Sequence, residues 1–186
     1  MLLAASLRRD SVNKKLINVT ANLLRARGVL VDLVDFAEFE MPLYNGDYEE
    51  ELGLPEKATI FIKRLKEADG LVLASPEYNF SVPGALKNLI DWVSRVRPIS
   101  AGWGGMPILL LSASPSLAGG SRGLLHTRVG LEVCGAYVYP KQFSVSDAYN
   151  AFNEAGEFID EKRMESLDKL LIEFNNYVKA IKKIEK

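Results

Sequence analysis

The sequence has very few of the residues that build disulfide frameworks and metal clusters, and it has no long apolar run. Its 186 residues include a single cysteine, Cys134, and a single histidine, His126. One cysteine can form neither an internal disulfide nor a thiolate cluster, and no basic and apolar leader precedes the first motif, so we expect a cytoplasmic protein. No uninterrupted apolar run approaches the roughly 20 residues that cross a bilayer, and we expect no association with membranes.

A surplus of charge of one sign is also missing. The chain has 23 basic and 24 acidic residues, which gives a formal net charge of −1. A dedicated nucleic-acid binder needs a basic surplus to neutralise phosphates, so we expect no nucleic-acid partner. The length and a hydrophobic content of 48% suit one domain over residues 1–186.

Apolar runs of strand length alternate with segments of helical periodicity, a pattern typical of an α/β fold with a parallel sheet and crossover helices. Strands are expected at 2–5, 29–35, 70–75, 106–113 and 135–145. Helices are expected at 11–27, 55–68, 83–97, 122–134 and 161–185, the last with Asp160 as its N-cap. We interpret 36–54 and 146–160 as solvated loops; a partner surface or a lid is the alternative.

Ligands of open parallel sheets bind beyond the carboxyl ends of the strands, so the loops after the first, third and fourth strands are the candidates. The first loop offers the hydroxyls of Ser6 and Ser11, the guanidinium of Arg8, the amide of Asn13 and the backbone N–H groups of a helix start. These donors suit a phosphate. An ordinary capped helix would explain Ser11 alone. The loop lacks the glycine pattern of dinucleotide-binding folds and the lysine of a P-loop.

The second loop, 75–84, places two aromatic residues between a strand and a helix. Pro83 suits the first helical turn and Ser81 is the N-cap candidate, so Tyr78 and Phe80 are held in a short irregular segment at the sheet edge. Such rings suit a planar heteroaromatic ligand, although ordinary packing is the alternative. The third loop, 112–123, is rich in glycine and serine, typical of a donor-rich ligand loop or of a flexible turn. Together the three loops fit flavin mononucleotide (FMN).

Residues 75–92, SPEYNFSVPGALKNLIDW, closely resemble the signature of the NAD(P)H-dependent FMN reductases, and 6–13 and 119–123 resemble their first and third loops. The resemblance implies a flavodoxin-like three-layer sandwich with a five-stranded parallel sheet of order 2-1-3-4-5. It also implies non-covalent FMN, NADPH or NADH as co-substrate, and two-electron reduction of quinone, flavin, azo or metal-oxyanion acceptors. One departure is Ala5, where the family usually has glycine.

The resemblance also assigns the cofactor-binding residues. Those of the first loop would hold the phosphate, those of the second would line the ribityl chain and the ring system, and those of the third would face the pyrimidine end of the flavin. They are Ser6, Arg8, Ser11, Val12 and Asn13; Pro76, Glu77, Tyr78, Asn79, Phe80 and Ser81; and Ser112, Ser114, Gly119 and Gly120. Because hydride passes through the flavin, we assign no acid–base residue.

The helix that begins at Pro83 predicts self-association. Its apolar stripe faces the sheet, but Trp92 points off that stripe and would be exposed in a monomer, so we expect a homodimer or homotetramer, as the resemblance also implies. His126 and Cys134 are interpreted as structural, and 102–105 as a turn, with a lid as the alternative. The alternative functions are a flavodoxin-type one-electron carrier and a cofactor-free interaction protein. A response-regulator receiver is excluded because its acidic residues are missing after the first and third strands.

Overall fold

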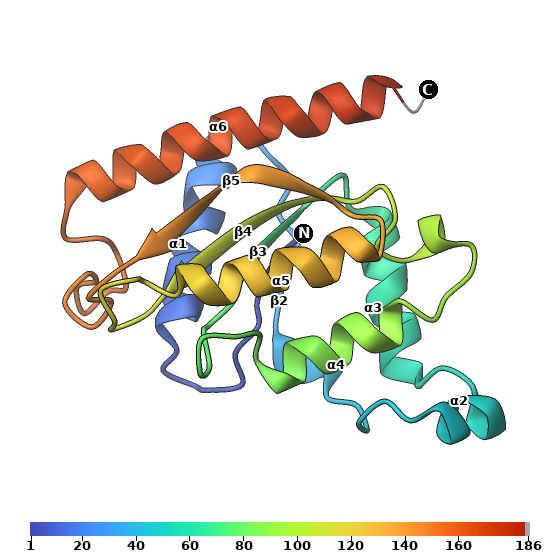
Figure 1. Cartoon of the computed structure of the whole chain (residues 1–186). Helices are drawn as coiled ribbons and strands as arrows, with labels where there is room; N and C mark the ends of the chain where they lie inside the picture. The colour runs from blue at the N-terminus through green and yellow to red at the C-terminus, as the bar shows by residue number, and fades with distance from the viewer. Residues whose placement is uncertain (185–186) are drawn as a thin grey trace.

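The computed structural model describes residues 1–184 and forms a parallel sheet of five strands between two layers of helices (Figure 1). The strand order is β2-β1-β3-β4-β5, which confirms the flavodoxin-like order predicted from the sequence. The elements are β1 (Leu2–Ala4), α1 (Val12–Ala26), β2 (Leu33–Val34), η1 (Phe36–Phe39), α2 (Gly46–Leu52), α3 (Glu56–Glu67), β3 (Leu71–Ala74), α4 (Gly84–Val93), η2 (Ile99–Ala101), β4 (Pro107–Ala113), α5 (Ser121–Val133), β5 (Tyr137–Val145) and α6 (Glu161–Ile184).

The central strands are covered on both faces, so their side chains divide between two cores. In β4, Ile108 and Leu110 pack with α3, α4 and α5, whereas Leu109 and Leu111 pack with α1 and α6. Figure 1 shows the same division, with α6 and α1 on one side of the sheet and α3, α4 and α5 on the other. This arrangement explains why the middle strands are continuous apolar runs.

The segment 36–54, predicted as a loop, contains η1 and α2 instead. The side chain of Asn45 accepts a hydrogen bond from Asp47 N at 2.9 Å, and Gly53 ends α2 with a φ of 73°. An asparagine cap followed by acidic residues and a glycine stop is a helix signal. The helix is short and has no buried residue, so it lacks the apolar stripe on which the sequence prediction relied.

The same segment covers Trp92, which is 0% exposed. Its indole N–H donates to Pro42 O at 2.8 Å, and the rings of Tyr44 and Tyr48 pack edge-on against it, with centroids 5.0 and 5.6 Å away. The prediction that Trp92 is exposed in a monomer is therefore wrong, because a neighbouring part of the same chain buries it.

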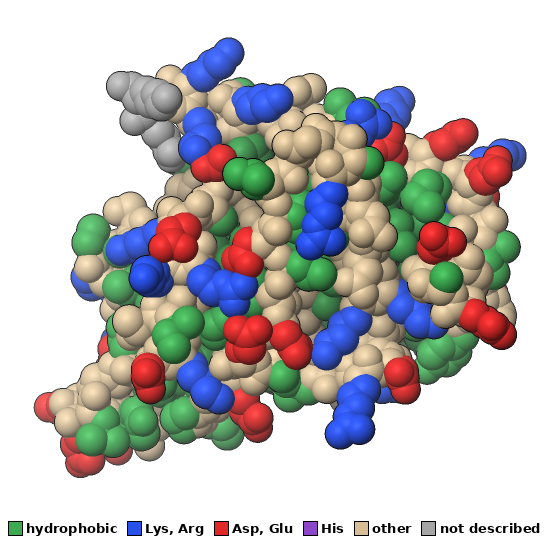
Figure 2. All heavy atoms as spheres, turned by 180° about the vertical axis from the view of Figure 1, so that it is seen from behind, with side chains coloured by type: hydrophobic (Ala, Val, Ile, Leu, Met, Phe, Trp, Pro, Cys, Tyr) green, Lys and Arg blue, Asp and Glu red, His purple; other side chains and the backbone are tan. Residues whose placement is uncertain are grey.

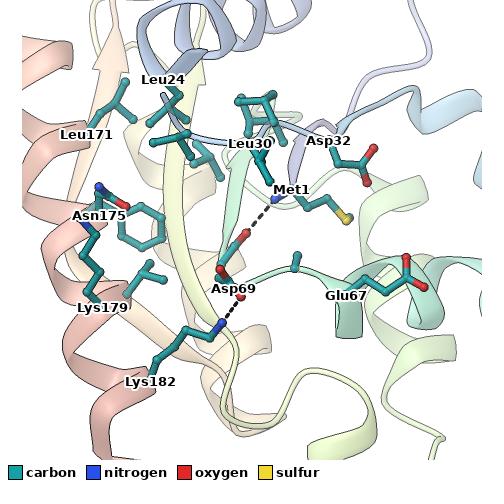
Figure 3. A pocket seen from close by; sticks show the side chains of 18 of the residues that line it. Met1, Leu24, Leu30, Asp32, Glu67, Asp69, Leu171, Asn175, Lys179 and Lys182 are labelled. Carbon is teal, nitrogen blue, oxygen red and sulfur yellow. Dashed lines mark hydrogen bonds and ion pairs between the residues drawn. The ribbon is translucent and has the colours of Figure 1, made fainter. Parts of the chain in front are cut away.

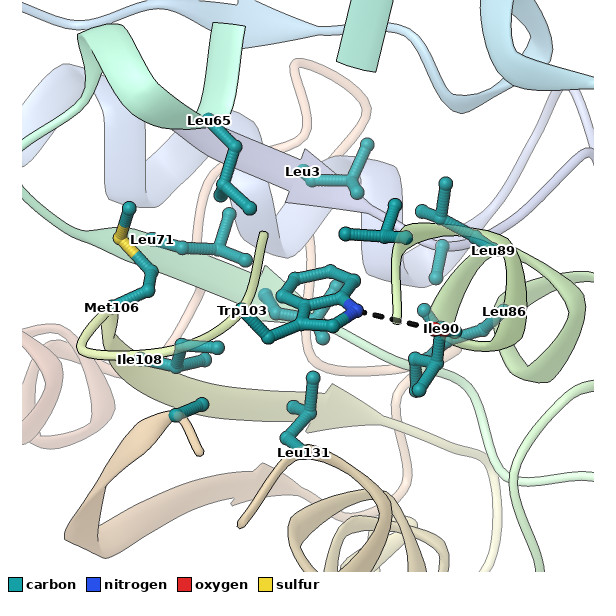
Figure 4. Close-up of a cluster of buried hydrophobic side chains, with 14 of the residues drawn as sticks. Leu3, Leu65, Leu71, Leu86, Leu89, Ile90, Trp103, Met106, Ile108 and Leu131 are labelled. Atoms are coloured by element: carbon teal, nitrogen blue, oxygen red, sulfur yellow. Dashed lines mark hydrogen bonds between the residues drawn. The ribbon is translucent and has the colours of Figure 1, made fainter. Parts of the chain in front are cut away.

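The turn at 102–105 places Trp103 in the centre of one core. This side chain is 1% exposed, lies among aliphatic residues of β3, β4, α4 and α5, and donates from Nε1 to Ile90 O at 3.2 Å (Figure 4). Trp103 thus joins the approach to β4 to the helices that cover that face.

The strand predicted at 29–35 is reduced to Leu33–Val34 because Leu2, the first residue of β1, pairs with Leu33, so residues 29–31 have no strand beside them. A cavity of about 600 Å³ lies there, between the amino ends of the strands and α6 (Figure 3). Two charged groups at its edge are satisfied within the chain: the Met1 ammonium donates to Gly70 O at 3.0 Å, and Lys182 pairs with Asp69. The cavity is at the opposite end of the sheet from the three candidate loops.

The outer surface carries charges of both signs. On the face shown in Figure 2, Lys and Arg side chains are interspersed with Asp and Glu. None of the helices within residues 1–184 combines the length and the apolarity that a membrane span requires.

Candidate functional site

The loops after β1, β3 and β4 meet at the carboxyl edge of the sheet, where they enclose a cavity of about 90 Å³. The cavity brings together nine residues predicted from the sequence with four that were not predicted. The nine are Ser6, Arg8, Ser11, Val12, Asn13, Pro76, Glu77, Tyr78 and Ser114; the four are Asp10, Ala113, Pro115 and Tyr149.

The first loop offers donors to an anion. Within the described chain, the backbone N–H groups of residues 7–10 make no hydrogen bond. The loop enters α1 at its positive end, and Ser11 caps that helix by accepting from Asn13 N at 3.2 Å. Arg8 is exposed and forms none of the ion pairs found among residues 1–184. This donor set fits a phosphate. The lining also holds two carboxylates, Asp10 and Glu77, and Glu77 accepts a hydrogen bond from the backbone of α5.

The amide of Asn13 locks the first loop to β4. Asn13 Nδ2 donates to Ala113 O at 2.9 Å, and Ala113 N donates to Asn13 Oδ1 at 2.9 Å. Both polar groups of this buried side chain are thus engaged by backbone. The Asn13 amide therefore positions the loop beside β4, and its role as a phosphate donor stays a prediction.

The second loop is a tight hairpin. Tyr78 N donates to Ser81 O at 3.1 Å and Ser81 N donates to Tyr78 O at 3.0 Å. The two residues at the tip, Asn79 and Phe80, have φ values of 50° and 62°, the left-handed pair that a two-residue turn of this kind requires. The side chains of Tyr78 and Phe80 are exposed, so the hairpin presents aromatic surface at the sheet edge beside the donor-rich loop.

The second loop is also fastened to α5. Glu77 Oε2 accepts a hydrogen bond of 2.7 Å from Gly123 N in the first turn of α5, where backbone N–H groups lack helical partners. The hydroxyl of Ser81 lies 3.1 Å from His126 Nδ1. Ser81 was predicted to cap α4, but that position is taken by Pro83 and no side chain caps the helix. The serine hydroxyl faces α5 instead.

A family model described as NADPH-dependent FMN reductase matches residues 1–150. The chain belongs to this family. Membership makes the protein an oxidoreductase that works with FMN and a reduced nicotinamide co-substrate.

Relatives of this reductase cover almost its whole length. The chain is 33% identical over 184 residues to a quinone reductase of Escherichia coli K12, and 33% identical over 181 residues to the NAD(P)H-dependent FMN reductase PA1204 of Pseudomonas aeruginosa. Each alignment covers 97% of this chain and 95% of the relative. Among solved structures, FerB of Paracoccus denitrificans, a flavoenzyme NAD(P)H:acceptor oxidoreductase, matches with a TM-score of 0.80 and 26% identity, covering 96% of both chains.

The third loop of the reductase differs most from the prediction. Ser112 is fully buried, and a Cβ on Gly120 would lie 2.0 Å from its Oγ. Likewise, a Cβ on Gly119 would lie 2.9 Å from Ser146 N. Both glycines have positive φ, and they bring their backbone close to the sheet rather than opening it to a ligand. Ser112, Gly119 and Gly120 do not line the cavity in this structure, whereas Ser114 does.

Other residues of the reductase agree better with their predictions. The methyl group of Ala5, which replaces the usual glycine, is buried in the core with Leu3. Burial raises the pKa of the Cys134 thiol, so this side chain is protonated and inert near neutral pH. Asp160 caps α6 by accepting from Lys162 N at 2.9 Å, as predicted; residue 185, included in the predicted helix, lies outside the described residues.

Tyr149 is the most informative lining residue that was missed. It follows β5 in the long connection 146–160 and reaches the same carboxyl edge as the other loops. The signal was available, because an aromatic residue directly after the last parallel strand lies at the edge where ligands bind.

Proposed function

We propose that the protein holds FMN non-covalently at the carboxyl edge of the sheet and reduces quinone-type, flavin, azo or metal-oxyanion acceptors by two electrons at the expense of NADPH or NADH. One observation carries the proposal: a cavity lined by free N–H groups and Arg8 lies beside an exposed aromatic hairpin. The E. coli and P. aeruginosa relatives, named as quinone and FMN reductases, support the same chemistry.

Each part of the site has a separate task in this proposal. Bound FMN supplies a ring that takes up and releases hydride. The first loop binds the phosphate through backbone N–H groups, the hydroxyls of Ser6 and Ser11, and Arg8. Glu77 and the hairpin orient the ring system, and Tyr78 and Phe80 shield it from water. We propose that Ser114 approaches the pyrimidine end from the third loop. Because hydride passes through the flavin, we assign no proton-transfer role to a side chain.

We further propose a ping-pong sequence in which the nicotinamide and the acceptor use the same exposed face in turn. The exposed rings of the hairpin leave one open surface for a flat substrate, because the cavity beside them is assigned to FMN in this proposal. The competing function is a flavodoxin-type carrier of single electrons, which shares this fold.

Anaerobic mixing of the FMN-loaded protein with NADPH or NADH tests the reductase proposal. We expect complete bleaching of oxidised flavin without a persistent semiquinone, followed by reoxidation with a benzoquinone. A stable blue semiquinone and no bleaching by either nucleotide would instead favour the electron carrier. Protein that takes up no flavin at all would favour the cofactor-free interaction protein.

Replacing Asn79 with glycine is expected to slow the bleaching step about tenfold while most FMN stays bound, because the amide orients the ring and the phosphate donors are elsewhere. Glycine is the right substitution because Asn79 has a φ of 50°, which a larger apolar side chain would adopt only with strain. Stopped-flow absorbance measures the rate, and equilibrium titration measures FMN retention. Equal bleaching rates for the variant and the wild type would show that Asn79 does not orient the flavin ring.

We also propose a homodimer or homotetramer, because α5 has an exposed apolar face. Leu125, Val129 and Val133 form a stripe along this helix and are 53%, 60% and 82% exposed. The Arg128–Glu132 pair beside the stripe carries both signs, so two copies of α5 packed antiparallel would match in charge.

Cytoplasmic localisation stays a proposal that rests on the single cysteine.

Replacing Val129 with aspartate is expected to weaken self-association at least about tenfold, since the charge would be buried without a partner. Light scattering across a concentration series measures the effect. The matched control is Leu30→Asp, which adds the same charge at a 97% exposed residue just before β2, the edge strand on the other side of the sheet from β5 and α5. If the wild type is monomeric at micromolar concentration, or if both variants associate equally well, α5 is not the interface.

A further inference from the structure

The only histidine of the chain, His126, contacts the aromatic hairpin that borders the candidate site. Its Nδ1 lies 3.1 Å from the hydroxyl of Ser81, the last residue of the hairpin 78–81. A hydroxyl both donates and accepts, so this pair forms whichever ring nitrogen of the histidine carries the proton. Nothing in the sequence pattern connects His126 with the second loop, because 45 residues separate the two partners.

The first two turns of α5 hold the hairpin at two further points. Glu77, just before the hairpin, accepts from Gly123 N at 2.7 Å, and the guanidinium carbon of Arg122 lies 4.7 Å from the centroid of the Phe80 ring. Positions 122, 123 and 126 are neighbours on one side of a helix, so these contacts form one clamp, defined by Arg122, Gly123 and His126.

Gly123 allows α5 to approach the second loop closely. A Cβ at this position would lie 3.0 Å from Glu77 Cβ and 3.1 Å from Ser81 O, closer than most side chains come to their neighbours. The helix therefore lies directly against the backbone of the second loop.

The hairpin needs an external clamp because its conformation is strained. Asn79 tolerates a positive φ, but Phe80 at 62° is an aromatic residue in a region that its Cβ disfavours. Within the hairpin only the two backbone hydrogen bonds between Tyr78 and Ser81 oppose this strain. Such a conformation persists only where surrounding structure determines it, and α5 supplies that structure.

We propose that His126 is a positioning residue that holds the hairpin in its left-handed turn and so sets how tightly a flat nicotinamide or acceptor ring binds. The expected effect of His126 on substrate binding rests on the proposed function, whereas its expected effect on the hairpin does not. A preformed platform binds a ring without the loss of freedom that a mobile loop would suffer. His126 therefore acts through Ser81 and touches no reacting atom.

The first test uses the protein without added flavin or substrate. We expect His126→Ala to speed amide hydrogen exchange at residues 79–81 about tenfold, and His126→Asn to restore most of the protection, because an amide can replace the contact to the serine hydroxyl. Gly123→Ala is expected to speed the same exchange by displacing the loop. The control is Glu132→Ala near the far end of α5. Unchanged exchange in His126→Ala, or an Asn variant as fast as the Ala variant, overturns the proposal.

The second test uses the FMN-loaded enzyme with NADPH and a benzoquinone. His126→Ala is expected to raise the KM values about fivefold and to change kcat less than twofold, with recovery in His126→Asn. A fall in kcat at constant KM would contradict a positioning role. If the wild type shows no turnover at all, the reductase proposal fails, and the exchange experiment alone decides whether His126 holds the hairpin.

Discussion

Replacing Arg8 with alanine is expected to weaken FMN binding about 10–150-fold. Arg8 lines the candidate cavity, and its guanidinium has no carboxylate partner within residues 1–184. Losing one charge-assisted hydrogen bond to a phosphate costs about 1.5–3 kcal/mol, which corresponds to that range. Equilibrium titration of the flavin-free protein with FMN measures the change.

The neighbouring arginine provides the control. Arg9 is also exposed and carries the same charge, but it does not line the cavity, so Arg9→Ala should change FMN affinity by less than about twofold. Riboflavin, which lacks the phosphate, should bind wild type and Arg8→Ala equally. If Arg8→Ala and Arg9→Ala weaken FMN binding to the same extent, the general positive charge of the loop is responsible rather than a specific phosphate-binding site.

Replacing Trp103 with alanine is expected to destabilise the protein by about 3–5 kcal/mol, the usual cost of removing a buried large aromatic side chain. The indole is 1% exposed and joins the approach to β4 to α4 through its bond to Ile90 O (Figure 4). For a domain of this size the midpoint of thermal unfolding should fall by about 10 °C. Differential scanning calorimetry measures it.

Trp103→Phe keeps most of the apolar surface but removes the N–H donor and part of the ring system, so it loses the hydrogen bond with only a small share of the packing. We expect about a third of the loss caused by alanine. FMN affinity at a temperature where both variants are folded should stay at the wild-type value, since Trp103 precedes the amino end of β4 and the candidate site lies beyond its carboxyl end. A large loss of affinity in the folded variants would contradict this separation.

The fold was predictable because the apolar runs of β3 and β4 and the periodicity of the helices report burial directly. The edge of the sheet was not. The apolar run 29–35 predicts a strand, but strand length depends on the neighbour, and β1 reaches only far enough to pair with Leu33 and Val34. Trp92 shows a similar limit. Helical periodicity places it off the sheet-facing stripe, but cannot reveal that Tyr44 and Tyr48 cover it.

The candidate site was predictable as a set of loops but less so as a set of contacts. Residue type identified Arg8, Ser11 and Tyr78, which do meet at one cavity. Residue type could not tell which polar groups are already engaged. Asn13 and Ser81 look like free donors in the sequence, but the partners of their side chains, Ala113 and His126, are distant in sequence.

The α2 segment has a consequence for how the molecule opens. The helix buries no residue of its own, and the segment is attached by two tyrosine rings on Trp92 and by polar contacts, among them Arg95 to Glu49 at 2.8 Å and Tyr44 N to Asn88 Oδ1 at 2.8 Å. Arg95 holds the pKa of Glu49 below its usual range, so this tie persists at neutral pH and is lost only when the pH falls through that lowered value. A segment that contributes no buried residue from its helix detaches at a lower free-energy cost than the sheet unfolds. Because this segment covers Trp92, the fluorescence of the Trp92 indole reports partial opening. It changes while both cores, one of which contains Trp103, are still intact.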